Sequence, residues 1–533
     1  MSQKNDIETI ISGNAILGIE LGSTRIKAVL INQKNQPIVS GEYGWENRYQ
    51  DDNWTYDLDD VWNGIQQAYE DLVNRVYGEH SVRLTKVAAI GVSGMMHGYL
   101  AFDEQENLLT PFRTWRNNYT SQASNVLMEL FNHPTPQRWS ISHLYQAILN
   151  TEPHVTDLDF ITTLAGYVHW QLTGKKVLGI GDASGMFPID ITTGNYYGNM
   201  LNKFDQLVAE KQYSWKIFDI LPKPLKAGQE AGQLTKAGAL KIDPSGRLQA
   251  GCSLCPPEGD AGTGMVATNS VAANTGNVSA GTSIFAMLVL EGTLSQVYPE
   301  LDLVTTPDGK LVAMAHSNNC TSNIDAWVSL FRESMVAMGI EVDINKLYSS
   351  LYNQALLGDK DCGGLLAYGY TSGEHITGFE QGRPLFVCST NSRFNLANFM
   401  RVNLQSSFGA MKIGIDMLVK QEGLKLEKIM AHGGLFKTPG VAQALLAGTL
   451  NAPVAVMDTA GEGGAWGIAL LASYRVNNVL GETLAEFLND KVFAHGNESV
   501  IVPTEADVNG AEQFMQRYKR GLVIEQAAVD NLV

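Results

Sequence analysis

Apolar residues near the start of the chain form two short runs separated by a small polar turn. Residues 16–21 and 25–31 are mostly aliphatic, and Gly22-Ser23-Thr24 lies between them. Two apolar runs joined by a turn of small residues predict a β-hairpin. A second hairpin of the same kind is predicted at residues 277–289, around Gly281-Thr282-Ser283, which lies 259 residues further along. The repeat indicates a duplicated domain, with Gly22 and Gly281 at equivalent positions.

Both turns have the composition of a phosphate-binding loop. Glycine lets the backbone approach an anion, while backbone N–H groups and the hydroxyls of Ser and Thr can donate to phosphate oxygens. A single hairpin with small turn residues is also an ordinary structural element. Because two copies share spacing and chemistry, we favour phosphate binding. Two such turns facing one cleft would hold a polyphosphate.

The rest of the first half alternates between strands and helices. Residues 87–92 form a short, wholly apolar run, which is typical of a strand in a sheet covered on both faces. Residues 57–77 carry apolar side chains at helical spacing, with Asp59 and Asp60 in the first turn. This alternation predicts an α/β fold, and the chain is too long for one hydrophobic core.

The pattern after the second hairpin predicts a second α/β domain. We expect helices at residues 325–338, 399–420 and 440–450, a strand at 428–431 and helical segments over 481–533. The join between domains should lie near residues 269–274, which gives domains at residues 1–272 and 273–533. The active site is expected in a cleft between them.

Composition and charge exclude several classes of partner. Apolar residues make up 44% of the 533 residues and charged residues 17%, as in an ordinary globular protein, and the formal charge is −17. Nucleic acids and anionic membranes bind basic surfaces, so neither is an expected partner. The N-terminal segment is polar, and no run of about 18 apolar residues occurs, so we expect a cytoplasmic protein. Five scattered cysteines predict reduced thiols; Cys252 and Cys255 have the spacing of half a zinc site, but we favour a buried structural pair.

An acidic residue flanked by glycines stands just before the predicted domain join. In Glu258-Gly259-Asp260-Ala261-Gly262, the Asp260 carboxylate could enter a cleft with the backbone close to a ligand, although Asp and Gly are also the usual residues of a plain turn. The sequence from Gly262 to Ala267 matches the G-x-G-x-x-A pattern of dinucleotide-binding loops. A nicotinamide-dependent oxidoreductase is therefore one function that the sequence has to be tested against. No acid follows at the spacing that a ribose requires, and no Walker-type G-x-x-x-x-G-K-[ST] sequence occurs.

An ordered set of further motifs carries a family resemblance. These are Gly94-Met95-Met96-His97-Gly98, Thr114-Trp115-Arg116-Asn117-Asn118, Gly181-Asp182-Ala183-Ser184-Gly185, Ala431-His432-Gly433-Gly434 and the glycine-rich segment at residues 461–467. With the two hairpins, the set resembles the FGGY family of carbohydrate kinases, in the actin and hexokinase superfamily. The resemblance implies two ribonuclease H-like domains with a cleft between them, and ATP-dependent phosphorylation of a sugar. The segment around Met96 and His97 is most similar to xylulokinases.

The resemblance also implies roles for individual residues. Asp260 would be the catalytic base that takes a proton from a sugar hydroxyl as it attacks the γ-phosphate of ATP. Glu20 stands where the family has an aspartate that organises Mg²⁺, and its extra methylene leaves the metal geometry open. Gly433 and Gly434 match the turn over which adenine lies, although a plain strand-to-helix turn explains them equally well on local grounds. The phosphate contacts would come from Gly22, Ser23, Thr24, Lys27, Gly281 and Thr282.

Met96, His97 and Trp115 would line the sugar pocket together with Asp260. His97 offers a hydrogen bond and Trp115 an apolar wall, whereas without the resemblance a lone His and a lone Trp are more often structural. Two departures from the xylulokinase pattern, Arg116-Asn117-Asn118 and Ala261, lie near the sugar. We therefore expect a kinase for a ketose, with the pentulose xylulose as first candidate, phosphorylated at a terminal hydroxyl. Its ligands would be ATP, Mg²⁺ and the sugar, and a homodimer is left open; a non-catalytic sugar sensor with the kinase fold is a further alternative.

Overall fold

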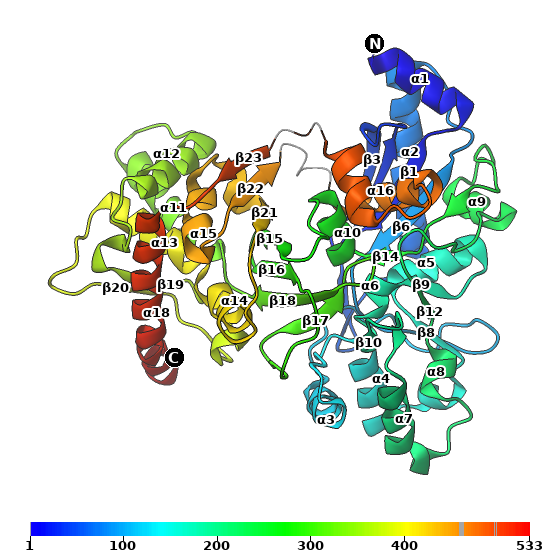
Figure 1. Cartoon of the computed structure of the whole chain (residues 1–533), viewed down its shortest axis with the longest axis horizontal. Coiled ribbons are helices and arrows are strands. Elements are labelled where there is room, and N and C mark those ends of the chain that lie inside the picture. Colours follow the sequence, from blue (N-terminus) through cyan, green and yellow to red (C-terminus); the bar gives the residue numbers. More distant parts are fainter. Residues whose placement is uncertain (1, 458–462, 495, 497, 533) are drawn as a thin grey trace. The chain divides into compact units, whose positions relative to one another are not determined.

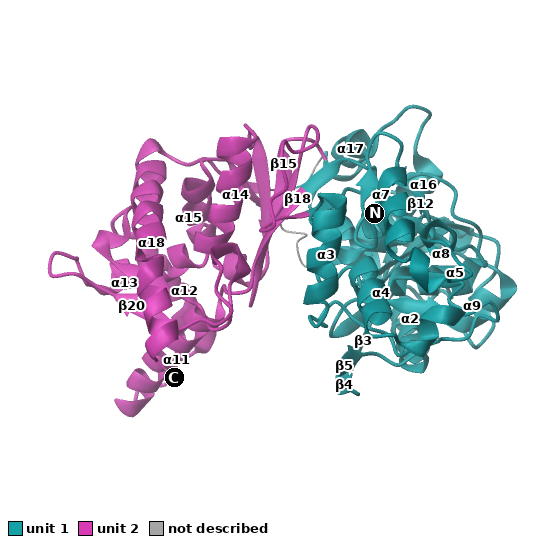
Figure 2. Ribbon diagram, turned by 90° about the horizontal axis from the view of Figure 1, so that it is seen from below, with its two compact units in different colours: residues 1–271, 303–312, 461–496 teal, residues 272–302, 313–460, 497–533 magenta. Residues whose placement is uncertain are grey.

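The computed structural model describes residues 2–457, 463–494, 496 and 498–532. The chain forms two compact units, coloured separately in Figure 2. Unit 1 contains residues 1–271, 303–312 and 461–496, and unit 2 contains residues 272–302, 313–460 and 497–533. The first change of unit coincides with the predicted join, but two later segments also fold with unit 1. The division into domains at residue 272 stays a prediction. In the described part of the chain, no helix is long and apolar enough to cross a membrane.

Unit 1 is built on a mixed sheet with strand order β13-β6-β1-β2-β3, and β14 also pairs with β6. The strands β1, β2 and β3 are antiparallel neighbours, whereas β6 runs parallel to β1, and β13 and β14 run parallel to β6. Their bounds are β1 Ile16–Leu21, β2 Arg25–Ile31, β3 Pro37–Gly44, β6 Ala89–Gly94, β13 Ser253–Leu254 and β14 Glu258–Gly259. The first predicted hairpin and the buried strand at residues 87–92 are therefore confirmed.

Helices cover both faces of this sheet. The odd-numbered residues of β1, such as Ile19, share a core with Ile65 and Leu72 of α2 (Leu58–His80), which confirms the helix predicted at residues 57–77. Gly18 alternates to the other face, where a Cβ would lie 2.2 Å from the carbonyl of Ala465 in α16 (Gly463–Asn477). Successive side chains of a strand point to opposite faces, so α2 and α16 lie on opposite sides of the sheet. Figure 1 shows α16, coloured orange, among the blue strands from the start of the chain.

Unit 2 repeats the central part of this arrangement. Its strands follow the order β18-β16-β15-β21-β22-β23, and the hairpin β15–β16 is antiparallel while β21 runs parallel to β15 and β22 parallel to β21. Their bounds are β15 Thr275–Ala280, β16 Ile284–Val289, β18 Leu311–Ser317, β21 Lys428–His432, β22 Val454–Met457 and β23 Glu498–Ile501. The order β13-β6-β1-β2-β3 in unit 1 thus corresponds to β22-β21-β15-β16-β18, as duplication predicts.

The helices of unit 2 match the sequence pattern with two corrections. Of the helical segments predicted over residues 481–533, α18 belongs to unit 2, whereas α17 (Leu484–Phe487) folds with unit 1 and residues 498–501 form the strand β23. The predicted helices at residues 325–338 and 440–450 are α11 and α15, and the one expected at residues 399–420 is two helices, α13 and α14. The chain turns at Ser407 and Phe408, which buries the Phe408 side chain. Gly409 then lies against α18, where a Cβ would be 2.4 Å from the ring of Tyr518. The bounds are α11 Ser322–Ala337, α13 Leu396–Ser406, α14 Gly409–Gln421, α15 Val441–Leu450 and α18 Glu505–Asn531.

Candidate active site

The turn of the first hairpin is held through its carbonyl groups. The indole of Trp45 donates to the Gly22 carbonyl at 2.7 Å, and the Tyr56 hydroxyl donates to the Ser23 carbonyl at 2.5 Å. The N–H of Gly22 closes the turn onto the Arg25 carbonyl at 3.0 Å. Within the described part of the chain, the N–H groups of Ser23 and Thr24 have no acceptor. Free N–H groups on a tight turn suit an anion such as phosphate.

The turn of the second hairpin is held in the same way by different donors. The Gly281 N–H donates to the Ser283 carbonyl at 2.9 Å. The carbonyls of Gly281 and Thr282 accept from the backbone N–H groups of Thr321 and Cys320, at 3.2 and 3.0 Å, just before α11 begins. The turn therefore lies at the N-terminus of a 16-residue helix, where backbone N–H groups and the helix dipole also favour an anion.

The two glycines after β21 have different surroundings. Gly433 has φ +105°, and a Cβ there would lie 2.3 Å from the carbonyl of Ala280, at the end of β15. This contact explains Gly433 by packing within unit 2, without a ligand. Gly434 has no atom within 4 Å of the position that a Cβ would take. The predicted adenine contact therefore has room at Gly434, and both assignments stay predictions.

Glu20 lies on β1, directly opposite Lys27 of β2 and next to Ser93 of β6. Its Oε2 accepts a hydrogen bond from the backbone N–H of Ala465, 445 residues away, at 3.0 Å. Gly464, which precedes Ala465, must be small, because a Cβ there would lie 2.1 Å from Oε1 of Glu20. Burial and the nearby charge of Asp260 raise the pKa of Glu20 to about 7, against the opposing effects of the Ala465 hydrogen bond and Lys27. Two carboxyl groups that repel each other in this way suit a cation between them and bound phosphates.

Asp260 begins α10 (Asp260–Ala267), immediately after β14. Its Oδ1 accepts from the backbone N–H groups of Met96 at 3.1 Å and Ala261 at 3.0 Å. No hydrogen bond to Oδ2 is present in the part of the chain that the structure describes, so that oxygen has no partner that a substrate hydroxyl would have to displace. Burial raises the pKa of Asp260, and the two backbone hydrogen bonds oppose that rise. A raised pKa makes the carboxylate a stronger base.

His97 follows Met96 in the loop after β6, and the Met96 N–H binds Asp260. The backbone of His97 has φ +68°, which is uncommon for a residue other than glycine. Burial lowers its pKa to about 3, and the Arg138 charge acts in the same direction, so the imidazole is neutral near pH 7. Nδ1 lies 3.3 Å from the carbonyl of Gly185, which can only accept, so Nδ1 carries the proton. Nε2 can then accept a hydrogen bond from a sugar hydroxyl.

Trp115 connects the expected sugar pocket with the first turn. Its indole N–H donates to the Ser23 hydroxyl at 3.3 Å, and the side chain is 39% exposed. An exposed aromatic face held at one edge can serve as a wall for a ligand. Within unit 1, the structure therefore links Trp115 to the turn and Met96 to Asp260.

Two further acids in unit 1 were not among the predicted site residues. Glu258 is buried and accepts from the N–H groups of Gly181 at 3.1 Å and Asp182 at 2.9 Å, which ties α6 (Ile180–Ala183) to β14. Asp182 is also buried; its Oδ2 accepts from the Thr163 hydroxyl at 2.7 Å, while Oδ1 has no partner in the described chain. Burial raises the pKa of each carboxyl group to about 8, and the charge of Asp260 contributes at Asp182. In the sequence, the glycines around Asp182 were the feature that could have pointed to Glu258. The buried Glu258 leaves no room for a larger residue, because a Cβ on Gly181 would lie 2.5 Å from its Oε2.

Comparison with known families identifies the arrangement. Residues 15–243 match the N-terminal domain and residues 276–476 the C-terminal domain of the FGGY family of carbohydrate kinases. The chain belongs to this family. It is therefore an ATP-dependent sugar kinase, a phosphotransferase that acts on sugar hydroxyl groups.

Several similar proteins align with nearly the whole of this chain. The xylulose kinase of Haemophilus influenzae is 22% identical over 521 residues, which cover 94% of this chain and 98% of that protein. The crystal structure of the xylulose kinase from Lactobacillus acidophilus has a TM-score of 0.77 at 16% identity and covers 97% of this chain and 99% of that one. The xylulose kinase structure from Rhodospirillum rubrum has a TM-score of 0.78 at 14% identity, covering 96% and 99%. The fold is the α/β fold of FGGY kinases, with two actin/hexokinase-like domains.

Family membership and structure together exclude the nicotinamide alternative. Gly262, Gly264 and Ala267 all lie inside α10, whereas a dinucleotide-binding loop places its first glycines in the turn before the helix. All five cysteines are free, as predicted. Among the residues that the structure describes, no group of three or more His, Cys, Asp or Glu side chains could hold a metal ion by itself. Gly461 and Glu462 of the glycine-rich segment lie outside the described residues.

Proposed function

We propose that this FGGY kinase phosphorylates a ketose at a terminal hydroxyl, with xylulose as the first candidate. The observation that supports the proposal is the hydrogen bond from the Met96 N–H to Asp260, which joins the loop that carries His97 to the proposed base. A protein named xylulose kinase aligns with 94% of the chain at 22% identity, which supports the same substrate class. A cytoplasmic location and a homodimer stay predictions.

In the proposed reaction, Asp260 takes the proton from the terminal hydroxyl of the sugar. The hydroxyl oxygen forms a bond to the γ-phosphorus of ATP, and the bond from that phosphorus to the β,γ-bridging oxygen breaks, which releases ADP. His97 would accept a hydrogen bond from a second hydroxyl at Nε2, and Trp115 would cover the carbon chain. These contacts orient the sugar, which is the main source of rate enhancement in such a transfer.

The phosphates of ATP would be bound by the N–H groups and hydroxyls of the two turns, with Lys27 as an additional cation. We assign Glu20 as the residue that holds Mg²⁺, through water as is usual in the family, because it is an acid with a raised pKa beside a second acid. Bound Mg²⁺ would supply neutralisation of phosphate charge. That the turns of units 1 and 2 bind the same nucleotide stays a prediction.

A coupled assay of ADP release over a panel of ketoses, aldoses and polyols tests the proposal. We expect turnover of ketoses with a free terminal hydroxyl, and ³¹P NMR should show a phosphomonoester at that carbon. The Asp260→Asn variant gives the background rate. Equal turnover of glycerol, or activity confined to aldohexoses, would contradict the proposed substrate class.

A further inference from the structure

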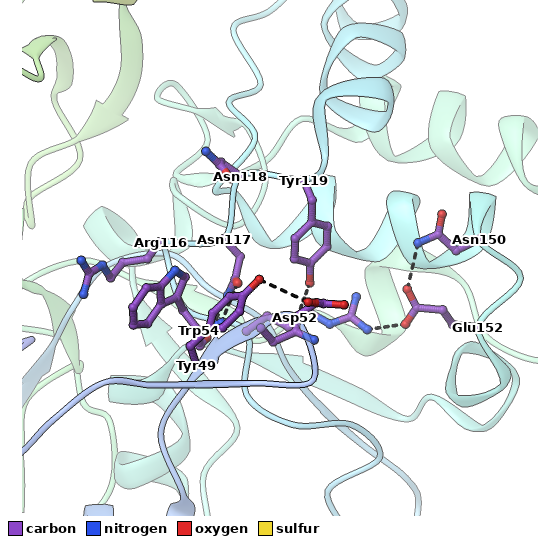
Figure 3. Close-up of a pocket in the computed structure, with 11 residues that line it drawn as sticks. Tyr49, Asp52, Trp54, Arg116, Asn117, Asn118, Tyr119, Asn150 and Glu152 are labelled. Atoms are coloured by element: carbon purple, nitrogen blue, oxygen red, sulfur yellow. Dashed lines mark hydrogen bonds and ion pairs between the residues drawn. The ribbon is translucent and has the colours of Figure 1, made fainter. Parts of the chain in front are cut away.

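A cavity of about 540 Å³ in unit 1 contains none of the predicted site residues (Figure 3). It is lined by the hairpin of β4 (Arg48–Gln50) and β5 (Asn53–Thr55), by Arg113 and residues 116–119, and by Asn150 and Glu152. Its volume lies within the usual range for sites that bind small molecules. The lining includes Arg116-Asn117-Asn118, the segment in which the chain departs from the xylulokinase pattern.

The cavity contains a buried cation with unused donors. The Arg113 side chain is only 7% exposed, and its Nη2 pairs with Glu152. Nε and Nη1 of Arg113 are buried and have no hydrogen-bond partner in the described chain. A buried donor without an acceptor destabilises a protein, so such donors need an explanation. The guanidinium also lies 5.5 Å from the Tyr99 ring centroid, which supplies no oxygen acceptor. Arg113 lines the cavity, so an oxygen-rich ligand there is the acceptor that we consider.

The remaining wall is aromatic and polar. Figure 3 shows Tyr49 and Trp54 side by side, with ring centroids 5.2 Å apart, and the Arg116 guanidinium beside Trp54. The Arg116 Cζ lies 4.4 Å from the Trp54 ring centroid. Tyr119 points toward the hairpin, where its hydroxyl donates to Asn53 at 2.6 Å. Aromatic faces pack against the C–H groups of a sugar ring, and amides and guanidinium groups bind its hydroxyls.

The charges of the lining decide between a neutral and an anionic ligand. Arg113 and Arg116 are balanced by Asp52 and Glu152, so the cavity has no excess of positive charge to attract an anion. We infer that this cavity is a second ligand site, which binds a neutral saccharide. The site lies within one unit and does not depend on the proposed kinase reaction.

Calorimetric titration of the full chain with D-glucose and maltose tests the inference, with gluconate as the charged probe. We expect one of the neutral sugars to bind with a Kd of about 10 mM or lower, and gluconate to bind more weakly. Arg113→Lys keeps the charge that faces Glu152 but removes the two unused donors. This change should weaken binding about tenfold or more.

Two equally exposed tyrosines provide variants that separate a loss of binding from a general effect on folding. Tyr49 and Tyr77 are both 57% exposed, but only Tyr49 lines the cavity. Tyr49→Ala should weaken saccharide binding several-fold, whereas Tyr77→Ala should leave it unchanged. Asp260→Asn should retain the binding, because Asp260 is not part of the cavity.

Four outcomes would overturn the inference. The first is that neither neutral sugar binds, and the second is that gluconate binds more tightly than both. The third is that Arg113→Lys and Tyr49→Ala leave the affinity unchanged. The fourth is that Asp260→Asn abolishes binding, which would place the sugar at the kinase site. These binding measurements do not depend on the panel assay, so a failure of the proposed ketose kinase activity would leave them unchanged.

Discussion

In unit 1 the turn at Gly22 is held by aromatic side chains, whereas in unit 2 the turn at Gly281 is held by backbone. Trp45 and Tyr56 reach the first turn from outside the hairpin. The second turn rests on two N–H groups at the start of α11. Both solutions occupy the carbonyl side of the turn and leave N–H groups for an anion. The same local design can therefore be fixed either by side chains, which many substitutions remove, or by backbone N–H groups, which only a substitution by proline removes.

The two hairpins also differ in charge at one equivalent position. Glu20 in β1 corresponds to Ser279 in β15, since each is the residue two before the turn glycine. Glu20 lies beside Ser93 on the neighbouring parallel strand, and Ser279 lies beside His432. Only the first hairpin places an acid there. We infer that unit 1 carries the acid chemistry and that unit 2 mainly binds the nucleotide.

Asp260→Asn should have the largest effect, because it removes the base from unit 1 without changing the shape of the side chain. General-base losses are typically about 10²–10⁴-fold, so kcat should fall at least about 100-fold while the affinity for ATP changes little. Steady-state kinetics, ATP titration and thermal unfolding of this variant give the three readouts. Near-normal kcat with a lower Tm would mean that Asp260 only holds the turn.

Gly433→Ala and Gly434→Ala separate packing from ligand contact in unit 2. At Gly433 the strained backbone and the 2.3 Å approach to Ala280 predict a loss of about 2 kcal/mol or more in the free energy of unfolding. A loss of that size lowers Tm by roughly 4–8 °C. Gly434→Ala should leave Tm unchanged and raise the KM for ATP, because the methyl group enters open space where adenine is expected. Equal losses of Tm in both variants would contradict this distinction.

Glu20→Gln tests whether the acid in the first hairpin serves the metal. The amide can still accept from Ala465, so the fold should be retained, but the charge that would attract Mg²⁺ is lost. Turnover should fall by about tenfold, a typical loss for one supporting group at a metal site, and more Mg²⁺ should be needed for half-maximal rate. Ser279→Ala, at the equivalent position of unit 2, is the control and should not alter the Mg²⁺ dependence. A changed sugar KM with unchanged Mg²⁺ dependence would refute the assignment.

Trp45→Phe should have the smallest effect and addresses the support of the first turn directly. The change removes the 2.7 Å hydrogen bond to the Gly22 carbonyl, worth about 1 kcal/mol, so the KM for ATP should rise about fivefold. Trp62→Phe is the matched control, because it removes a 3.1 Å indole hydrogen bond to Tyr167 elsewhere in unit 1. If both variants changed the ATP KM equally, the turn would not depend on its aromatic support.

Local pattern was a reliable guide where the structure is local. Apolar runs joined by small turn residues predicted both hairpins, and the helical spacing of apolar residues predicted α2. It failed at residues 399–420, where one apolar period continues through a turn between two helices. Nothing in that period shows that Phe408 must be buried or that Tyr518, more than 100 residues later, packs against Gly409. Such a break depends on a partner from elsewhere in the chain.

The sequence by itself determined the two hairpins, the α/β fold and, through its motifs, the resemblance to FGGY kinases, because each depends on residues close together in the chain. Only the tertiary structure decided that α16 covers β1 and that the Ala465 N–H binds Glu20, since these contacts join residues far apart in the sequence. The neutral state of His97 and the raised pKa values of Glu20 and Asp182 were likewise set by burial. The cost of desolvating a charge depends on everything packed around it, which no local pattern specifies.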